Sequence, residues 1–363
     1  LFSIFGASNV FGQVANYNFS ESAGTYTSTT GTIVHASGWD DAASANTIPL
    51  GFTFNFNGTN YTTCSVNSNG YITFGATTSA NNLYTPISSG TGYTGVISAL
   101  GFDLISNTST IIYTTIGVAP NRTFIAQWNN ARRYSGGTIA GDFNFQIRLS
   151  ETTNIINVVY GSCTPATNTN YNVQVGLRGS SNTDFNNRSF SGNAVWDNST
   201  TAGLTNNATC KTRDVSFPNS GRTFTWTPPT PPTITSLGAS SGCVGTSLVI
   251  NGTNLTGATA VTIGGTAAAI TATTATTVTV TVGAGTTGTV QVTTPGGSVT
   301  SATTFTVNAA PVITTQPVVT SICTTGTGTF SVVVTGATTY QWRRAGVDLI
   351  NTAPYSGVNT ATL

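Results

Sequence analysis

Hydrophobic and polar residues alternate with a period of two in many short segments of this chain. The alternation is clearest in residues 52–56 and 143–149, where phenylalanine, isoleucine or leucine occupies every second position and polar residues stand between them. This period is that of a β-strand with one buried face and one face in solvent. Pairs such as Asn57-Gly58 and Asn69-Gly70 separate the segments and favour tight turns. The pattern predicts an all-β protein built of β-sandwiches.

A proline-rich stretch divides the chain. Pro228-Pro229-Thr230-Pro231-Pro232 favours a short, stiff, extended spacer. Composition also changes there, because the residues from Thr223 to Trp342 include no Asp, Glu, Lys, Arg or His. A second, weaker boundary lies near residue 308. We therefore expect five parts: an N-terminal extension (1–14), a β-sandwich (15–227), a linker (228–232), a second domain (233–308) and a third domain (309–363).

The first residues differ from the rest of the chain. Leu1–Ala7 is apolar, and the residues that follow up to Gln13 are mostly small or polar. This pattern is similar to the end of a secretory signal peptide, with cleavage near Gln13. An ordinary first strand is the alternative. A signal peptide would place the protein outside the cell.

Residues 233–308 contain Thr- and Val-rich strands separated by Gly-containing turns. The stretches with the most specific pattern are Pro232–Leu237, Asn251–Leu255, Val261–Gly265 and Thr294–Gly297. They resemble the immunoglobulin-like, plexin, transcription-factor (IPT/TIG) family over the whole module. The resemblance implies an immunoglobulin-like β-sandwich.

Residues 309–363 resemble part of an immunoglobulin-like domain. Trp342 stands where such a domain has its core tryptophan, and Val332 and Val334 would point inward on the preceding strand. The pattern departs at Cys323, which precedes the strand that would normally carry a cysteine. We expect an incomplete sandwich here, which a neighbouring domain or chain would complete.

The N-terminal sandwich resembles a domain found at the start of large exported proteins of Bacteroidetes. The segments that carry the resemblance are Val66–Phe74, Ile97–Leu104 and Asn172–Gly179. The stretch Ser68–Gly75 is also loosely similar to nidogen-type extracellular domains, and a lectin-like sandwich is the related alternative. Together with the immunoglobulin-like modules, the resemblance implies a secreted adhesin exported by the type IX system. It implies no catalytic residues, because the motif marks core strands.

Composition and charge exclude several classes of protein. Charged residues make up only 6% of the chain and the formal net charge is +1, so a nucleic-acid binder with a clustered basic face is not expected. Few residues favour long surface helices. Hydrophobic residues make up 38%, enough to bury a core, so the chain is not intrinsically disordered. No apolar run is long enough for a transmembrane helix.

The sequence offers no catalytic set. His35 is the only histidine, and its place in an apolar strand favours a structural role. The GxSxG pattern at Gly238–Gly242 has no histidine in its domain and no strand-to-helix turn. We therefore expect no enzyme activity within these residues, although a catalytic domain beyond Leu363 would be compatible with them.

Acids and aromatics on loops of the first domain are the candidate ligand contacts. The expected ligand-binding residues are Trp39, Asp40, Asp41, Asp103, Trp196 and Asp197. Tryptophan can stack on the apolar face of a sugar ring, and carboxylates can bind hydroxyl groups. The mixture suits a surface glycan, with a protein ligand as the alternative. No organic cofactor is indicated, but calcium takes oxygen ligands, and Asp103 is the acid best placed to contact it.

The chain has five cysteines and no spacing typical of a zinc site. In an exported protein, Cys163 and Cys210 are the best candidates for a disulfide, since both lie in loop-like stretches of one domain. Spacing alone does not establish the connectivity.

These observations predict a non-catalytic secreted or cell-surface adhesin that displays an N-terminal sandwich on immunoglobulin-like modules. Two alternatives stay open: the accessory region of a secreted carbohydrate-active enzyme, and a structural subunit of a filament or matrix. Further repeats in a longer chain would favour the adhesin, and an acid-bearing catalytic domain would favour the enzyme.

Overall fold

The structure is a computed structural model of the chain. It describes residues 13–76, 80–106, 108–134, 140–164, 170–193, 195–196, 200–212, 216–285, 287–318, 326–337 and 339–363. The chain divides into two compact units, the first containing the residues up to Thr230 and the second beginning at Pro231. This division falls within the proline-rich stretch. Residues 1–12, which include most of the predicted signal-peptide remnant, lie outside the described part.

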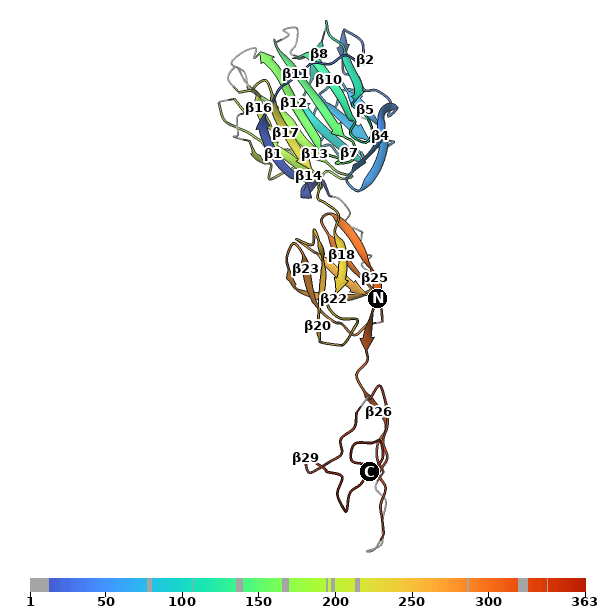
Figure 1. The fold of residues 1–363 in the computed structure, drawn as a ribbon. Helices are drawn as coiled ribbons and strands as arrows, with labels where there is room; N and C mark the ends of the chain where they lie inside the picture. The colour runs from blue at the N-terminus through green and yellow to red at the C-terminus, as the bar shows by residue number, and fades with distance from the viewer. Residues whose placement is uncertain are drawn as a thin grey trace. The chain divides into compact units, whose positions relative to one another are not determined.

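The first unit begins with a short 3-10 turn, η1 (Val14–Asn16), and contains two antiparallel sheets. The nine-stranded sheet has the order β1 (Asn18–Ala23), β17 (Arg222–Thr227), β12 (Ile156–Thr164), β11 (Ala140–Ser150), β10 (Thr123–Arg133), β8 (Leu104–Ser106) and β3 (Trp39–Asp40), and β10 also pairs with β9 (Ile111–Ile116), which pairs with β2 (Thr32–His35). Figure 1 shows β1, β17, β12, β11 and β10 in the upper part of the view.

The second sheet of this unit has eight strands. Its order is β15 (Thr201–Ala202), β14 (Phe185–Ser189), β13 (Tyr171–Arg178), β7 (Gly95–Gly101), β6 (Tyr71–Phe74), β5 (Thr59–Asn67) and β4 (Ile48–Phe56), with β16 (Cys210–Thr212) paired to β13. Each segment that resembles the Bacteroidetes domain contributes a strand of this sheet.

One hydrophobic core is shared by the two sheets of the first unit. Phe54 and Phe56 of β4 are fully buried in it together with Phe145 and Ile147 of β11, in agreement with the period of two. Val14 of the first turn is also fully buried there. The alternating faces therefore form a β-sandwich, and the predicted fold class is confirmed.

The second unit contains a smaller β-sandwich after the linker. Its strands follow the order β18 (Thr233–Leu237), β20 (Ser247–Thr253), β23 (Thr277–Thr281), β22 (Thr266–Thr273), β21 (Ala260–Ile263), β24 (Gly288–Thr294), β25 (Gly297–Asn308) and β19 (Ser241–Cys243). Alternate residues such as Val278 and Val280 are fully buried. The GxSxG pattern at Gly238–Gly242 begins directly after β18 and ends within β19, so a strand follows it and not a helix, which agrees with its interpretation as a chance match.

The described residues between 309 and 363 contain two short antiparallel strand pairs, β26 (Val312–Thr315) with β27 (Val333–Thr335) and β28 (Arg343–Arg344) with β29 (Val347–Asp348). Val332, Val334 and Trp342, which the immunoglobulin pattern places inward, are only half-buried. Among the hydrophobic residues described in this segment, Val358 alone is buried. Across the described residues, no helix is long and apolar enough to cross a membrane.

Candidate functional site

The Ser68-Asn69-Gly70 turn between β5 and β6 lies at the centre of the candidate site. Gly70 has a φ of +83°, and a Cβ there would lie 2.3 Å from the carbonyl oxygen of Leu100. The Gly70 carbonyl accepts hydrogen bonds from the backbone N–H groups of Ala99 and Leu100, at 3.0 and 3.2 Å. Glycine is therefore required both by the backbone conformation and by the close approach to the end of β7.

Asn69 is fully buried, and its amide group joins three segments of the chain. Its Oδ1 accepts a hydrogen bond from the backbone N–H of Leu104 at 2.9 Å. Its Nδ2 donates to Asp41 Oδ1 at 3.1 Å and to the carbonyl oxygen of Asn81 at 3.0 Å. A buried amide with satisfied donors and acceptors fixes its partners closely. Asn69 thus holds the residue after β3 and the start of β8 beside each other.

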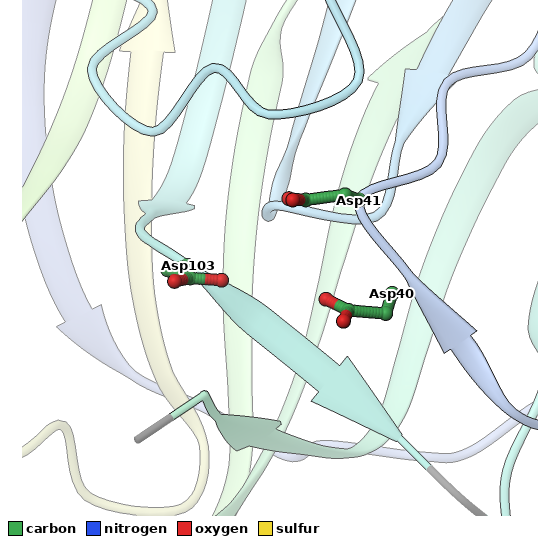
Figure 2. Close-up of side chains that lie close together, drawn as sticks. All are labelled: Asp40, Asp41 and Asp103. Carbon is green, nitrogen blue, oxygen red and sulfur yellow. The ribbon is translucent and has the colours of Figure 1, made fainter. Parts of the chain in front are cut away.

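Three carboxylates meet at this point, as Figure 2 shows. Asp40 ends β3, Asp41 follows it, and Asp103 directly precedes β8. One carboxylate oxygen from each lies within 4.8 Å of the others. Asp40 is exposed, and the other two are half-buried. Because β3 and β8 pair antiparallel, with Asp40 opposite Ile105, strand pairing brings together acids that are about sixty residues apart in sequence.

The crowding of these acids changes their protonation. Burial, followed by the charges of Asp41 and Asp40, raises the pKa of Asp103 to about 6, while Arg133 acts in the opposite direction. Partial burial and the neighbouring Asp41 also raise the pKa of Asp40. Burial contributes most to both pKa shifts, and the neighbouring carboxylates raise both values further.

Tyr84 completes the contacts of Asp41. Its hydroxyl group donates a hydrogen bond to Asp41 Oδ2 at 3.1 Å, so both oxygens of this carboxylate accept a hydrogen bond. Burial, this hydrogen bond and the nearby carboxylates raise the pKa of Tyr84 to about 12. The phenol therefore stays protonated at neutral pH and can donate to the carboxylate. Asp41 itself has a φ of 43°, a left-handed conformation that aspartate tolerates.

The donor set fits a hard divalent cation. Calcium binds six to eight oxygen ligands, among them carboxylates, carbonyl groups and water. The three acids supply carboxylate oxygens, and no histidine or cysteine of the described residues belongs to the group. Zinc, which favours histidine and cysteine, does not fit this set. Asp103, which the sequence analysis considered as a calcium contact, lies beside Asp40 and Asp41.

Aromatic residues lie beside Asp103. The ring of Phe102 is 5.8 Å from the ring of Tyr171, and the Arg133 guanidinium carbon lies 3.4 Å from the Tyr171 ring centroid. The backbone N–H of Tyr134 donates to the carbonyl oxygen of Asp103 at 3.0 Å, and the Tyr134 side chain is 47% exposed. The three carboxylates therefore have partly exposed aromatic and cationic neighbours.

The two tryptophans expected to contact a ligand are core residues, and this expectation was wrong. Trp39 lies in β3 and is 4% exposed. Trp196 is fully buried; its ring lies 5.8 Å from that of Tyr160, and its Nε1 donates to the carbonyl oxygen of Lys211 at 2.8 Å. Neither indole offers a free face to a sugar. Asp197 lies outside the described residues.

The predicted disulfide is also not present. Cys163 and Cys210 are both free thiols. Cys163 lies on β12 of the nine-stranded sheet, whereas Cys210 lies on β16, which pairs with β13 of the other sheet. Burial raises the pKa of the Cys163 thiol to about 12. The sequence placed both residues in loops, but each is in a strand.

His35 is compatible with the structural role that the sequence predicted. Its Nε2 lies 3.2 Å from the carbonyl oxygen of Val66, to which it donates in the appropriate tautomer. Burial lowers its pKa, so the ring is neutral at pH 7.

Sequence reasoning missed Asn69, Tyr171 and Arg133 as residues of the site. Asn69 stands in the Ser-Asn-Gly motif, which the resemblance presented as a marker of core strands. A polar triplet between two apolar strands was the available signal, since buried polar residues at a turn usually bind other parts of the chain.

Comparisons with known proteins agree with the division of the chain. The family profile described as "NIDO related" matches residues 16–228, and the profile "IPT/TIG domain" matches residues 232–307. The second match supports the predicted IPT/TIG module. No curated protein matches the sequence.

Several solved structures match part of the chain. An SGBP-B from a xyloglucan utilization locus of Bacteroides uniformis is 13% identical, with 53% of this chain and 47% of that chain covered and a TM-score of 0.19. An SGBP-B of Bacteroides ovatus in complex with a mixed-linkage heptasaccharide is 12% identical, with 56% and 65% covered and a TM-score of 0.18. A γ-CGTase of Bacillus clarkii is 13% identical, with 54% and 26% covered and a TM-score of 0.20.

The chain thus spans between 26% and 65% of the length of these solved chains. TM-scores near 0.2 do not indicate a shared overall fold, so the ligands of these proteins do not identify the ligand of this chain.

Proposed function

The chain belongs to the NIDO-related family through residues 16–228, and we propose that it is a non-catalytic surface or secreted binding protein whose acidic cluster holds calcium. We define the acidic cluster as Asp40, Asp41 and Asp103. The proposal includes a role in adhesion, with the NIDO-related sandwich as the ligand-binding domain and export by the type IX system.

The proposal rests on the close approach of the three carboxylates, which the fold holds within 4.8 Å of one another. Two unit charges about 5 Å apart repel by roughly 3 kcal/mol at an effective dielectric constant of about 20, before further screening by solvent. Yet the fold holds the acids together through the buried amide of Asn69 and the hydroxyl group of Tyr84. A bound dication would convert this repulsion into attraction. An arrangement that opposes ionisation without a ligand and suits a cation with one supports a binding role.

The surroundings of the cluster support a glycan as the ligand. Half-buried Phe102 and Tyr171 and exposed Tyr134 lie beside carboxylates that can accept hydrogen bonds from sugar hydroxyl groups. Calcium can also bind sugar hydroxyls directly, because they are neutral oxygen ligands. The ligand would then contact the cation and the neighbouring aromatic side chains at the same time.

Calcium binding is tested by isothermal titration of the full chain with CaCl2 and by its thermal unfolding in calcium and in EDTA. We expect one site and a rise in the unfolding temperature with calcium. Both should be lost in the Asp41→Asn, Asp103→Asn double variant. Asp142→Asn is the matched control, since Asp142 pairs with Arg132 at 2.6 Å and is not part of the cluster. Equal calcium responses of the wild-type chain and the double variant would contradict the proposal.

Ligand binding is tested separately on a glycan array. The wild-type chain should bind in calcium and lose binding in EDTA, and Tyr134→Ala should weaken glycan binding while leaving the calcium titration unchanged. Calcium binding without any glycan binding would support the cation site and contradict the glycan. Hydrolysis of any bound glycan would contradict the non-catalytic role.

A further inference from the structure

A row of side chains crosses the outer face of the nine-stranded sheet, the face turned away from the core. Strand pairing places Ile112 of β9 opposite Gln127 of β10, Gln127 opposite Gln146 of β11, and Gln146 opposite Val159 of β12. Thr223 of β17 continues the row. The core-facing residues are the alternate ones, such as Trp128 and Phe145 on β10 and β11. We call Ile112, Gln127, Gln146, Val159 and Thr223 the outer row.

Most of the outer row is buried, although an outer sheet face normally contacts solvent. Gln127 and Gln146 are fully buried, Val159 is 1% exposed and Ile112 is 7% exposed. Glutamine is rarely buried unless its amide is bound. Another part of the chain must therefore cover this row.

The cover is the segment 24–31, which we call the strap. It connects β1, paired with β17 near one side of the sheet, to β2, which pairs with β9 near the other side. The strap therefore crosses β17, β12, β11, β10 and β9. Figure 1 labels the first four of these strands. Eight extended residues reach about 26 Å, enough for the roughly 19 Å across five strands.

The two glutamines of the outer row bind the main chain of the strap. Thr29 donates its backbone N–H to Gln127 Oε1 at 2.9 Å, and Gln127 Nε2 donates to the carbonyl oxygen of Thr29 at 3.1 Å. Gln146 Nε2 donates to the carbonyl oxygen of Thr27 at 2.9 Å and also to Gln127 Oε1. Arg148 Nε in turn donates to Gln146 Oε1 at 2.7 Å and fixes that amide. Main-chain groups are common to every peptide, so these contacts recognise an extended peptide.

One side chain of the strap packs against a glycine of the sheet. The ring of Tyr26 lies over Gly161 of β12, where a Cβ would come within 2.9 Å of two ring carbons. Its hydroxyl group donates to Asn129 Oδ1 at 3.4 Å. The residues on both sides of Tyr26, Thr25 and Thr27, are exposed. The sheet thus accommodates one aromatic side chain beside the main-chain contacts.

The strap is attached to the sandwich only at its surface. None of its residues belongs to the hydrophobic core cluster or packs against it. A segment with few buried apolar contacts can detach without opening the core. Its detachment would expose the two buried amides, which would need new partners.

We propose that the outer row is a binding groove for an extended, uncharged peptide strand with an aromatic residue, and that the strap occupies this groove as a tethered internal ligand. The chemistry of the occupant follows from the contacts: main-chain N–H and C=O groups for the glutamines, and a ring for the space above Gly161. An incoming peptide binds when it displaces the strap. The groove does not involve the acidic cluster, so its function is independent of calcium.

The test uses the full chain and a fluorescent synthetic peptide with the sequence of residues 24–31. In the Tyr26→Ala variant the strap loses its ring contact with the sheet, so it competes less well with the added peptide for the outer row. We therefore expect this variant to bind the peptide at least tenfold more tightly than the wild-type chain, in calcium and in EDTA alike. A peptide with alanine at its tyrosine position should bind at least tenfold more weakly.

Two further variants keep the test decisive. Thr29→Pro removes the donor to Gln127 and loosens the strap by a second route, so it should also increase peptide binding. Adding Gln127→Leu to Tyr26→Ala should abolish binding, whereas Asn157→Ala, on the same face and bonded to Thr225 instead of the strap, should not change it. Absence of peptide binding by both loosened variants, or binding of oligosaccharides in place of the peptide, overturns the proposal.

Discussion

Replacing Asp103 with asparagine should stabilise the calcium-free protein while weakening its calcium response. Asparagine has the same shape as aspartate but carries no charge, so its introduction removes the cost of burying the carboxylate charge and the repulsion from Asp41 and Asp40. Among the residues that the structure describes, none forms a side-chain hydrogen bond with Asp103 that this change would break. A gain in stability combined with a loss of binding is typical of a functional residue and opposite to the behaviour of a structural one.

The magnitude follows from the raised pKa of Asp103. A shift from 3.8 to about 6 corresponds to roughly 3 kcal/mol at 1.36 kcal/mol per unit. Because the carboxyl group is substantially exposed, solvent screening reduces this figure to about 1 kcal/mol. The folded state binds the proton more tightly than the unfolded state, so the wild-type chain loses this amount as pH rises from about 4 to about 6. Well below pH 4 the Asp103 carboxyl group is protonated in both the folded and the unfolded state, and above about pH 6 the loss of stability no longer changes with pH.

The assay is urea unfolding in EDTA, followed by tryptophan fluorescence at pH 4 and pH 7. Four of the five tryptophans lie in the first unit, so the signal reports mainly on the sandwich that carries the cluster. The variant should be about 1 kcal/mol more stable than the wild-type chain at pH 7, and this difference should be much smaller at pH 4. Asp142→Asn, which breaks an ion pair with Arg132, should show no such gain. A variant that is less stable at pH 7, or a difference that does not change with pH, would refute the reasoning.

Three further predictions concern other parts of the chain. Gly70→Ala should lower the free energy of unfolding by about 3 kcal/mol, because a Cβ would meet the Leu100 carbonyl in a backbone conformation that alanine disfavours. Urea unfolding measures this loss, and a value below about 1 kcal/mol would show that the turn can relax. Among the four cysteines in the described residues, alkylation of the native protein should modify Cys243, which is exposed, and leave Cys64 and Cys210 unmodified, because burial raises their thiol pKa values. Mass spectrometry detects the modified residues, and rapid modification of Cys64 would contradict the packing of β5. Limited proteolysis should cleave in the linker 228–232 and release a folded fragment of about residues 15–227, since proline prevents the linker from joining a sheet. A fragment that unfolds on release would show that the sandwich depends on the rest of the chain.

The sequence alone determined the fold class and the positions of strands with a clear period of two, such as β4 and β11. A period of two places every second residue on one face, so burial of phenylalanines such as Phe54 and Phe56 is encoded locally. The proline-rich linker is equally local, because proline restricts the backbone wherever it stands. The sequence also placed Asp40, Asp41 and Asp103 among the candidate contacts, since acids beside turn residues are visible without a structure.

Only the tertiary structure decided which of these residues meet. Strand order within a sheet is not written in any short segment, yet the pairing of β3 with β8 brings Asp103 to Asp40 and Asp41. For the same reason the sequence could not show that Trp196 packs in the core or that Cys163 and Cys210 belong to different sheets. The outer row under the strap depends on the register of five strands at once. Such contacts are fixed by the closure of long loops and by core packing, which are properties of the whole domain.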